Sequence, residues 1–486
     1  ESGRCEEEMG CICGVKDKKV WEMWKIVLIV TLKAISVAQC AAAISAFCPP
    51  DSDIILGDNT TFCDCHMAHT APWGLPTMTI DCQGRELLTD NLPQDLILPF
   101  GTEELTLSWN NLTVVPTLPA SDHLRVLRLA HNAIETHSGS PFLNLPNLRY
   151  LDLSFNAITS ITDDIFEGLL HLDHLDLTHN QLQNLHNGAF GGLMVLKTLI
   201  LSENPLADFF TQENLFSYTS ITKDLKTLEV AKCNLTKLHL DEDWTLSKLV
   251  LRSNLFQAIP DIPISVQFLD FGGNYIKHID TDTFPPLPDL KELYLDNMEP
   301  LRTITADAFL PVAGKLRKIT LEGCRNLTTL DVSAFGNGTL DEHPLSLQEV
   351  NLRGCRLKRI KRNLLERAVN LTTLSLAGNP LTCDCDVEWI YQMEKETGAQ
   401  CSLPVILRGT KVSDLDMDQF HCDTARSWLY SILNGLIVFA LLCACGIAIY
   451  FLVMRCRPSR RHVVQKLALT SPYARVTIQP NQAEHL

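Results

Sequence analysis

Residues 148–158 read LRYLDLSFNAI, and this arrangement of leucines around one asparagine recurs along much of the chain. The pattern L-x-x-L-x-L-x-x-N-x-L also fits residues 124–134, 172–182 and 196–206, so four copies start 24 residues apart. Looser copies begin at Thr102, Leu225, Leu246, Val266, Leu290, Leu316, Leu347 and Leu371, which makes about twelve. A fixed period of this length indicates a solenoid of stacked units.

Each unit contains a short segment in which leucines alternate with variable residues, as they do in a strand with one buried face. One unit cannot bury its leucines alone, but stacked units share a continuous core. We therefore expect short parallel strands along the concave face of a curved solenoid. The asparagine at the ninth position should turn inward and satisfy backbone groups of the neighbouring turn. Cys233, Cys324 and Cys355 occupy that position, where cysteine is an accepted alternative.

Two further side-chain sets bear on packing. A disulfide between Cys324 and Cys355, in neighbouring coils, is the alternative to simple packing of these thiols. On the outer side, phenylalanines recur in phrases such as DIFEGLLHL and GAFGGLMVL, and we interpret them as a buried spine rather than a cofactor site. The members of this spine are Phe142, Phe166, Phe190, Phe284 and Phe309.

The repeats resemble those of extracellular leucine-rich repeat proteins, and the match covers residues 48–422. The resemblance implies an α/β-type solenoid, a horseshoe of about twelve repeats with cysteine-rich caps at both ends. Four cysteines precede the first repeat and four follow the last. In that family the first pairs with the third and the second with the fourth, which implies the disulfides Cys48–Cys65, Cys63–Cys82, Cys383–Cys401 and Cys385–Cys422. A zinc site is disfavoured, because zinc ligands usually come as C-x₂₋₄-C pairs in a reducing compartment.

Two apolar segments predict the topology. Residues 23–46 have the layout of a secretory signal peptide, and residues 1–22 before it are interpreted as a non-native leader. The segment 428–454 is long enough to cross a bilayer, and five cations follow directly, between Arg455 and Lys466 in the tail 455–486. We therefore expect a single-pass type I protein of the plasma membrane with an extracellular ectodomain. The ectodomain would comprise an N-terminal cap (47–101), the repeats (102–382) and a C-terminal cap with stalk (383–427).

The glycosylation sequons, the net charge and the lack of catalytic motifs narrow the class of function. Six N-x-S/T sequons, all between the signal segment and the membrane segment, predict glycosylation at Asn59, Asn111, Asn234, Asn326, Asn337 and Asn370. The net charge of −16 argues against a nucleic-acid partner. The sequence has no nucleophile elbow, HExxH motif, phosphate loop or kinase signature, so we predict neither an enzyme nor a bound cofactor or metal.

Function is then expected on the concave face, in the N-terminal half of the repeats. Aromatic and histidine side chains recur at the eighth position of successive repeats, beside charged residues at the fifth and ring side chains at the third. The predicted ligand-binding residues are Trp109, Arg128, His131, Tyr150, Asp152, Phe155, His174 and Asp176, with His179 in the same column as Phe155. Aromatics and arginine dominate binding energy in interfaces, although His and Phe before the asparagine are also ordinary filling in such repeats. A second candidate patch contains Phe268, Asp270, Tyr294 and Asp296.

The resemblance leaves the class of recognition open. The chain looks like capped adhesion proteins of the Capricious and Tartan type, which implies binding of an extracellular protein ligand. The alternatives are a co-receptor in innate-immune or growth-factor signalling and a membrane-tethered inhibitor of an extracellular enzyme. The ectodomain is also similar to that of Toll receptors, but the 32-residue tail is expected to be too short for a signalling domain. Ala440, Ala444 and Ala448 make a weak homodimer through the membrane helix possible.

Overall fold

The computed structural model describes most of the repeat array, both caps in part, and one C-terminal helix. It describes residues 63–68, 77–89, 98–99, 101–135, 139–185, 188–207, 224–240, 244–337, 344–393, 395–420 and 424–455. The expected leader and signal segment, Cys48, Asn59, Cys422 and the tail from residue 456 lie outside these ranges. The chain divides into two compact units, residues 1–420 and 421–486.

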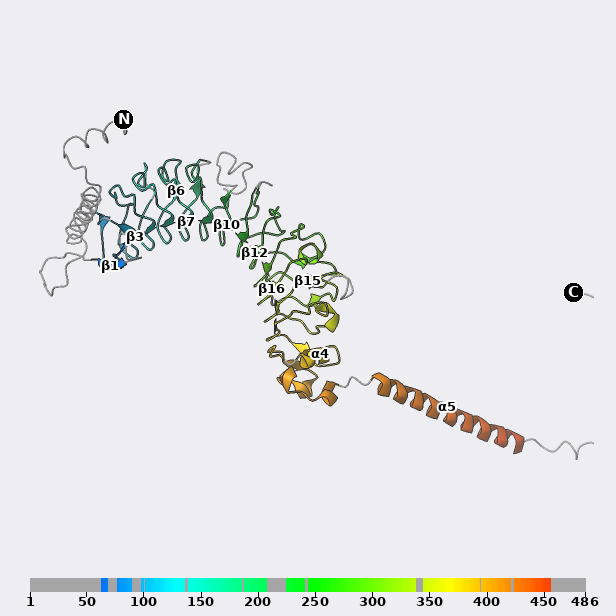
Figure 1. The fold of residues 1–486 in the computed structure, drawn as a ribbon. Helices are drawn as coiled ribbons and strands as arrows, with labels where there is room; N and C mark the ends of the chain where they lie inside the picture. The colour runs from blue at the N-terminus through cyan, green and yellow to red at the C-terminus, as the bar shows by residue number, and fades with distance from the viewer. Residues whose placement is uncertain are drawn as a thin grey trace, which may run out of the picture. The chain divides into compact units, whose positions relative to one another are not determined.

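One long sheet runs through the first unit and contributes one strand from each repeat (Figure 1). Its strand order is β1-β2-β3-β4-β5-β7-β9-β10-β11-β12-β14-β16-β18-β19, and every pairing after β1 with β2 is parallel. The twelve repeat strands are β3 Thr102–Thr106, β4 Val126–Arg128, β5 Tyr150–Asp152, β7 His174–Asp176, β9 Thr198–Ile200, β10 Thr227–Glu229, β11 Lys248–Val250, β12 Phe268–Asp270, β14 Glu292–Tyr294, β16 Lys318–Thr320, β18 Glu349–Asn351 and β19 Thr373–Ser375. This sheet lines the inner side of the curved array in Figure 1, as the repeat pattern predicts.

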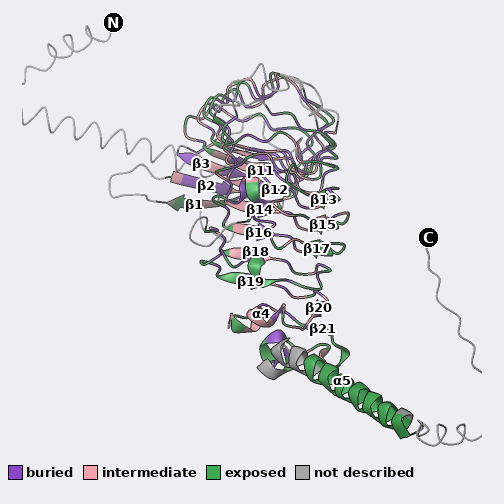
Figure 2. Cartoon of the chain, turned by 90° about the vertical axis from the view of Figure 1, so that its right-hand side faces the viewer, coloured by how far each residue is buried: buried purple, intermediate pink, exposed green. Residues whose placement is uncertain are grey.

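The opposite side of the coils carries only short strands and 3₁₀ turns. The outer strands are β6 Ser160–Ile161, β8 Asn184–Leu185, β13 His278–Ile279, β15 Thr303–Ile304 and β17 Thr329–Leu330, and the outer 3₁₀ turns are η3 Leu310–Val312 and η4 Arg362–Leu364. Figure 2 shows β13, β15 and β17 stacked across the coils from the long sheet. The inner strands are about 4.8 Å apart, whereas the outer phenylalanine rings of successive coils are 6.1–6.4 Å apart, so the array curves toward its sheet.

The core is a stack of leucines between these two sides. In the repeat that begins at Leu148, the side chains of Leu148, Leu151, Leu153 and Ile158 are all buried. The phenylalanine spine is also buried, with ring centroids 6.4 Å apart for Phe142 and Phe166 and 6.1 Å apart for Phe166 and Phe190. Phe284 and Phe309 form a second run of the spine, which Phe335 extends. The spine is therefore core packing, as the sequence predicts.

The ninth-position asparagines form the expected inward ladder. Asn156 donates from Nδ2 to the carbonyl oxygens of Leu129 at 3.0 Å and Leu153 at 3.0 Å, and its Oδ1 accepts the N–H of Ile134 at 3.0 Å. One amide thus joins two coils and satisfies backbone groups of both.

The three ninth-position cysteines replace this amide with a thiol. Cys233, Cys324 and Cys355 are buried and unpaired, so the alternative of a disulfide between Cys324 and Cys355 is not formed. Each sulfur lies near a carbonyl oxygen of the preceding coil, at 3.3 Å from Leu201, 3.2 Å from Leu295 and 3.1 Å from Leu321 respectively. Burial raises the pKa of the Cys233 thiol to about 11, so this side chain stays neutral and acts as a small core group.

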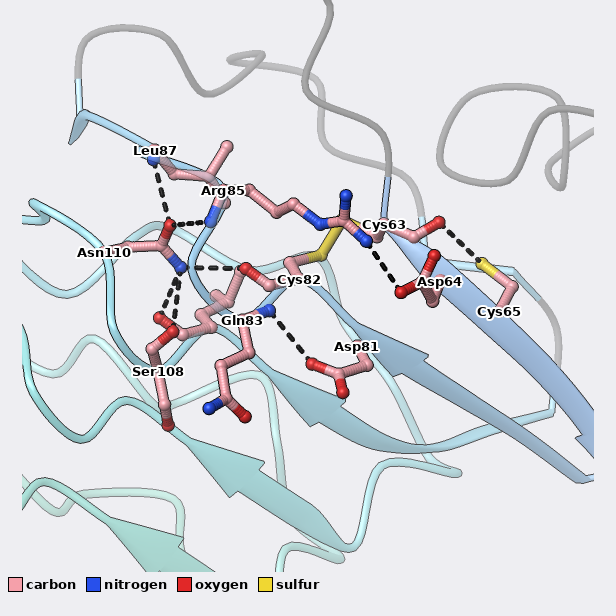
Figure 3. Close-up of a disulfide and its surroundings, with 11 residues drawn as sticks. Cys63, Asp64, Cys65, Asp81, Cys82, Gln83, Arg85, Leu87, Ser108 and Asn110 are labelled. Atoms are coloured by element: carbon pink, nitrogen blue, oxygen red, sulfur yellow. Dashed lines mark hydrogen bonds and ion pairs between the residues drawn. A yellow bond between two sulfur atoms is a disulfide. The ribbon is translucent and has the colours of Figure 1, made fainter.

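The N-terminal cap closes the array with a hairpin and a disulfide. Strand β1 Asp64–Ala68 pairs antiparallel with β2 Thr77–Asp81, and β2 pairs with the first repeat strand, β3. Figure 3 shows the Cys63–Cys82 disulfide next to Asn110, which donates to the Cys82 carbonyl at 2.9 Å. Cys65 is also disulfide-bonded. The cap is therefore tied to the first coil by backbone pairing and by the asparagine ladder.

The C-terminal cap begins where the leucine pattern ends. Strand β20 Leu381–Thr382 pairs with β21 Cys401–Leu403, helix α4 Glu388–Gln392 lies between them in sequence, and three 3₁₀ turns follow. These turns are η5 Val405–Leu407, η6 Val412–Asp414 and η7 Met417–Phe420. A disulfide joins Cys383 to Cys401, the pairing that the family resemblance implies, and Cys385 is disulfide-bonded as well. The second unit contains the helix α5 Thr424–Arg455, in which Ser431–Leu452 is long and apolar enough to cross a membrane.

Candidate ligand-binding surface

The eighth position of every repeat has the same unusual backbone conformation. Its φ is positive in all twelve repeats, the left-handed region that non-glycine residues rarely adopt. The residues and their φ values are Trp109 (59°), His131 (55°), Phe155 (53°), His179 (54°), Glu203 (61°), Lys232 (53°), Ser253 (56°), Gly273 (70°), Asn297 (54°), Gly323 (74°), Gly354 (68°) and Gly378 (75°). The conformation is therefore set by the repeat backbone, whichever side chain is present.

Backbone hydrogen bonds hold these eighth residues in register. The N–H of His131 donates to the carbonyl of Ser154 at 3.0 Å, and the N–H of Phe155 donates to that of Thr178 at 2.8 Å. Each eighth residue is thus fixed to the seventh residue of the next coil. Since successive coils are one strand spacing apart, planar side chains at this position are placed at stacking distance.

The first four repeats use this geometry to build a continuous stack of rings, which we name the aromatic ladder: Trp109, His131, Phe155 and His179. The ring centroids are 3.7 Å apart for Trp109 and His131, 4.1 Å for His131 and Phe155, and 4.6 Å for Phe155 and His179. The ladder is exposed to solvent, with Trp109 55% and Phe155 39% accessible. It is a rigid apolar ridge along one border of the inner sheet.

The ladder continues as a polar chain into the next two repeats. Nδ1 of His179 lies 2.9 Å from a carboxylate oxygen of Glu203, and Lys232 donates to the other oxygen at 2.7 Å. These bonds hold the pKa of Glu203 below its usual value, with Lys232 as the larger cause. Glu203 and Lys232 are not among the residues predicted from the sequence, although both occupy the column of eighth positions.

A second ring contact lies on the inner sheet beside the ladder. Tyr150 stacks on His174 across neighbouring strands, with centroids 4.4 Å apart, and the Arg128 guanidinium carbon lies 5.3 Å from the Tyr150 ring. Arg128 also forms an ion pair with Glu104, which sequence reasoning missed. We name Arg128, Tyr150 and His174 the Tyr150 cluster. All three side chains are half-buried, so the cluster is held in place before any ligand arrives.

Two carboxylates flank the Tyr150 cluster and lie directly opposite each other in the register of β5 and β7: Asp152 and Asp176. Asp152 accepts hydrogen bonds from the Ser154 backbone and hydroxyl, and Asp176 accepts one from the Thr178 backbone. Neither forms an ion pair with another described residue. The structure thus brings all eight predicted ligand-binding residues onto one surface of the first four repeats.

Burial and charge shift the titration of this surface. Burial raises the pKa of Asp176, and the neighbouring Asp152 charge raises it further. Burial also raises the pKa of Tyr150, again with a contribution from both carboxylates, and burial lowers the pKa of His174. Because Asp152 and Asp176 lie opposite each other on neighbouring strands and like charges repel, a positive group from a ligand would relieve this repulsion.

The second candidate patch differs from this surface because its charges already have partners. Phe268 and Tyr294 are in ring contact at 5.0 Å, and Lys248 and Lys318 lie over these rings at 5.3 and 5.5 Å. Both lysines are paired with carboxylates on neighbouring strands, at 2.7 and 3.0 Å. Asp270 is buried and faces Arg252, and Asp296 accepts a backbone N–H at 2.7 Å. Lys248, Lys318 and Asp270 of this patch are thus in ion pairs, whereas Asp296 has only a backbone N–H donor.

Comparison with known proteins agrees with the fold. Residues 101–158 and 146–206 match the family described as Leucine rich repeat. The chain therefore carries leucine-rich repeats of this family over residues 101–206. Among curated relatives, mouse Nephrocan is 28% identical over 184 residues, covering 34% of this chain and 36% of Nephrocan. Mouse CD180 antigen is 26% identical over 45% of the chain and 36% of its own length, and mouse Toll-like receptor 9 is 27% identical over 41% of the chain and 20% of its own length.

Similar solved structures have low sequence identity to this leucine-rich repeat protein. They include a TLR13–ssRNA13 complex, at 23% identity and a TM-score of 0.41, which covers 64% of this chain and 51% of that one. They also include the functional domain of InlJ from Listeria monocytogenes, at 20% identity and a TM-score of 0.44, over 66% of this chain and 72% of that one. The chain spans 36% of the length of Nephrocan and of CD180 antigen and 20% of that of Toll-like receptor 9.

Proposed function

We propose that this leucine-rich repeat protein is a cell-surface recognition protein that binds an extracellular protein ligand through the concave side of its first four repeats. The observation that carries the proposal is the aromatic ladder. Its rings occupy left-handed backbone positions that four of the eight later repeats fill with glycine, the residue that adopts them most readily. Strain retained at an exposed site is a reason to look for function there.

The chemistry of the surface supports a protein ligand. Trp109 and Phe155 offer exposed apolar area on a rigid ridge, and rigid aromatics give contact area at low entropy cost. Asp152 and Asp176 favour a basic side chain on the ligand, since their charges have no cationic partner among the described residues. We infer a ligand that presents an apolar ridge next to an arginine or lysine.

The distribution of glycosylation sequons supports the same region. Asn111 lies in the first repeat and Asn234 in the sixth, and no sequon lies between them. The described sequon asparagines, Asn111, Asn234, Asn326, Asn337 and Asn370, are all exposed. Glycans at these positions would leave the repeats that carry His131, Phe155 and His179 uncovered.

The membrane orientation is part of the proposal. Disulfides in both caps fit an oxidising compartment, and the cations after the apolar part of α5 fit a cytoplasmic C-terminus. The ectodomain would then face the outside of the plasma membrane. Cell adhesion is the first role that we propose for the chain. The similarity to Toll-like receptor 9 and CD180 antigen favours a co-receptor role as the second.

A paired substitution tests the binding surface. The double variant Arg128→Ala with Tyr150→Ala should weaken ligand or cell binding by more than 1 kcal/mol per side chain, which is about 30-fold together. Both side chains point away from the leucine core, so secretion should be normal. The matched control is Phe268→Ala with Tyr294→Ala, a ring pair in the same strand positions of the second patch.

Three outcomes separate the possibilities. Loss of binding in the first pair alone supports the proposed surface. Loss in the control pair alone moves the site to the second patch, and loss in neither removes the inner sheet from consideration. Aggregation of cells that express the chain would favour adhesion, whereas ligand-dependent association with a separate signalling receptor would favour the co-receptor role.

A further inference from the structure

The C-terminal cap presents apolar side chains at the tip of an ordered loop. Ile406 is 89% exposed and Val405 is 69% exposed, and Leu403 and Pro404 before them are exposed too. Ile406 is the most exposed large apolar side chain among the described residues. Four consecutive exposed residues without a polar side chain are unusual for a surface loop, which normally carries turn-forming polar residues.

Hydrogen bonds and a disulfide fix this loop. The N–H of Cys401 donates to Thr410 at 2.9 Å, and the N–H of Gly409 donates back to Cys401 at 2.8 Å, which closes the base of the loop. Cys401 is also joined to Cys383, and within the loop the N–H of Leu407 donates to Pro404 at 3.0 Å. The apolar tip is therefore built into the cap and cannot turn inward without breaking this base.

The chain that connects the end of the cap to the membrane segment is short. Residue Phe420 ends the cap, α5 begins at Thr424, and its apolar span begins at Ser431. Four extended steps and seven helical rises reach about 25 Å. A compact unit of the cap's size is also about 25 Å across. The end of the cap at Phe420 is therefore tethered within about 25 Å of the start of the apolar span at Ser431, a distance comparable to the width of the cap itself.

We propose that the tip of this loop, Val405 and Ile406, inserts into the outer surface of the membrane that α5 crosses. The ligand is the interfacial layer of the bilayer, where apolar side chains enter between headgroups while neighbouring cations meet lipid phosphates. Arg408 follows the tip and is exposed, and its Nε donates to the Ser402 carbonyl at 3.4 Å, which holds the cation beside the tip. The insertion would give the repeat array a second anchor besides α5 and restrict its tilt on the cell surface. The inference rests on α5 being a membrane span.

The test uses the full chain in phosphatidylcholine vesicles that contain a phospholipid with a photoactivatable diazirine near its headgroup. After illumination, labelled peptides are mapped by mass spectrometry. We expect label on the peptide that contains Val405 and Ile406, at least fivefold above that on peptides containing Ile264 or Val369. These two are matched controls, because they are exposed apolar side chains of the repeat array.

Variants separate tip insertion from general proximity. Val405→Ser with Ile406→Ser should reduce the label at the loop at least fivefold and leave the label on α5 unchanged. Ile406→Lys should do the same, and normal secretion of either variant shows that the cap is folded. Label on α5 with none on the loop would overturn the inference while leaving the membrane span intact. Absence of label from both would reject the span as well, and cross-linking of the loop to a second copy of the chain in place of lipid would reject insertion.

Discussion

The substitutions Phe155→Gly and Phe155→Ala together measure the backbone strain under the aromatic ladder. Both remove the ring and its contacts with His131 and His179, at 4.1 and 4.6 Å, each of which contributes about 0.5–1.5 kcal/mol. They differ only at the backbone, where φ is 53°. Alanine keeps a left-handed cost of about 1–2 kcal/mol, and glycine avoids it.

Phe155→Gly does not gain the full amount of about 1–2 kcal/mol over Phe155→Ala. Its unfolded chain has more conformational freedom, which costs about 0.5–1 kcal/mol relative to alanine. The difference leaves Phe155→Gly more stable than Phe155→Ala by about 1 kcal/mol. We expect Phe155→Ala to be the least stable of the three proteins, and Phe155→Gly to be between it and the native chain or equal to the latter. Urea denaturation followed by circular dichroism measures these free energies of unfolding.

Ser253 provides the matched control, because it has the same conformation, with φ of 56°, in a repeat without a ladder ring. Ser253→Gly should be more stable than Ser253→Ala by a similar amount and should bind ligand normally. Phe155→Gly should instead bind the ligand at least tenfold more weakly, although its backbone no longer carries the left-handed strain. If Phe155→Gly proves no more stable than Phe155→Ala, the strain argument fails. If it binds ligand as the native chain does, the ladder is not the binding surface.

Two further predictions concern the caps and the charged surface. Cys383→Ser removes the disulfide to Cys401 and should cost about 2–5 kcal/mol, so that far less protein reaches the cell surface than for Cys233→Ser, whose thiol is unpaired; equal surface staining would contradict this. Asp176→Asn should raise the melting temperature at pH 7. Burial raises the folded-state pKa of Asp176 above 3.8, so its ionised form costs stability above that pKa, and this cost disappears as the pH falls below 3.8. The gain from Asp176→Asn should therefore vanish below pH 3.8, and a gain of the same size at both pH values would exclude the carboxylate as its cause.

Much of the fold follows from the spacing of a few residue types. The strands around Leu127, Leu151 and Leu175 are three residues long and pair in the register that the 24-residue period implies. The buried asparagine ladder and the phenylalanine spine were also predictable. Each depends on a contact between the same position of successive coils, and a repeat supplies that contact once its period is known.

The geometry of the candidate surface was less accessible from the sequence. The columns of eighth, fifth and third positions predicted which side chains share a face, but not that Trp109, His131, Phe155 and His179 stack ring on ring. The left-handed backbone that causes the stacking had a signal in Gly273, Gly323, Gly354 and Gly378, which fill the same column in later repeats. The burial of Asp270 and the Arg128–Glu104 ion pair depend on side-chain rotamers, which the repeat pattern does not specify.

The eighth position explains how one backbone can carry different surfaces at its two ends. Because its conformation is imposed by hydrogen bonds to the next coil, the position tolerates any side chain at a cost of about 1–2 kcal/mol for those other than glycine. Four of the later repeats avoid the cost with Gly273, Gly323, Gly354 and Gly378, and two lysines of their inner face pair with carboxylates across the strands. The first four repeats retain it at every coil, and there the exposed rings adjoin two carboxylates without a cationic partner among the described residues. The proposed binding surface thus lies in repeats whose eighth residues all keep the left-handed strain, and a ligand would gain its binding energy there.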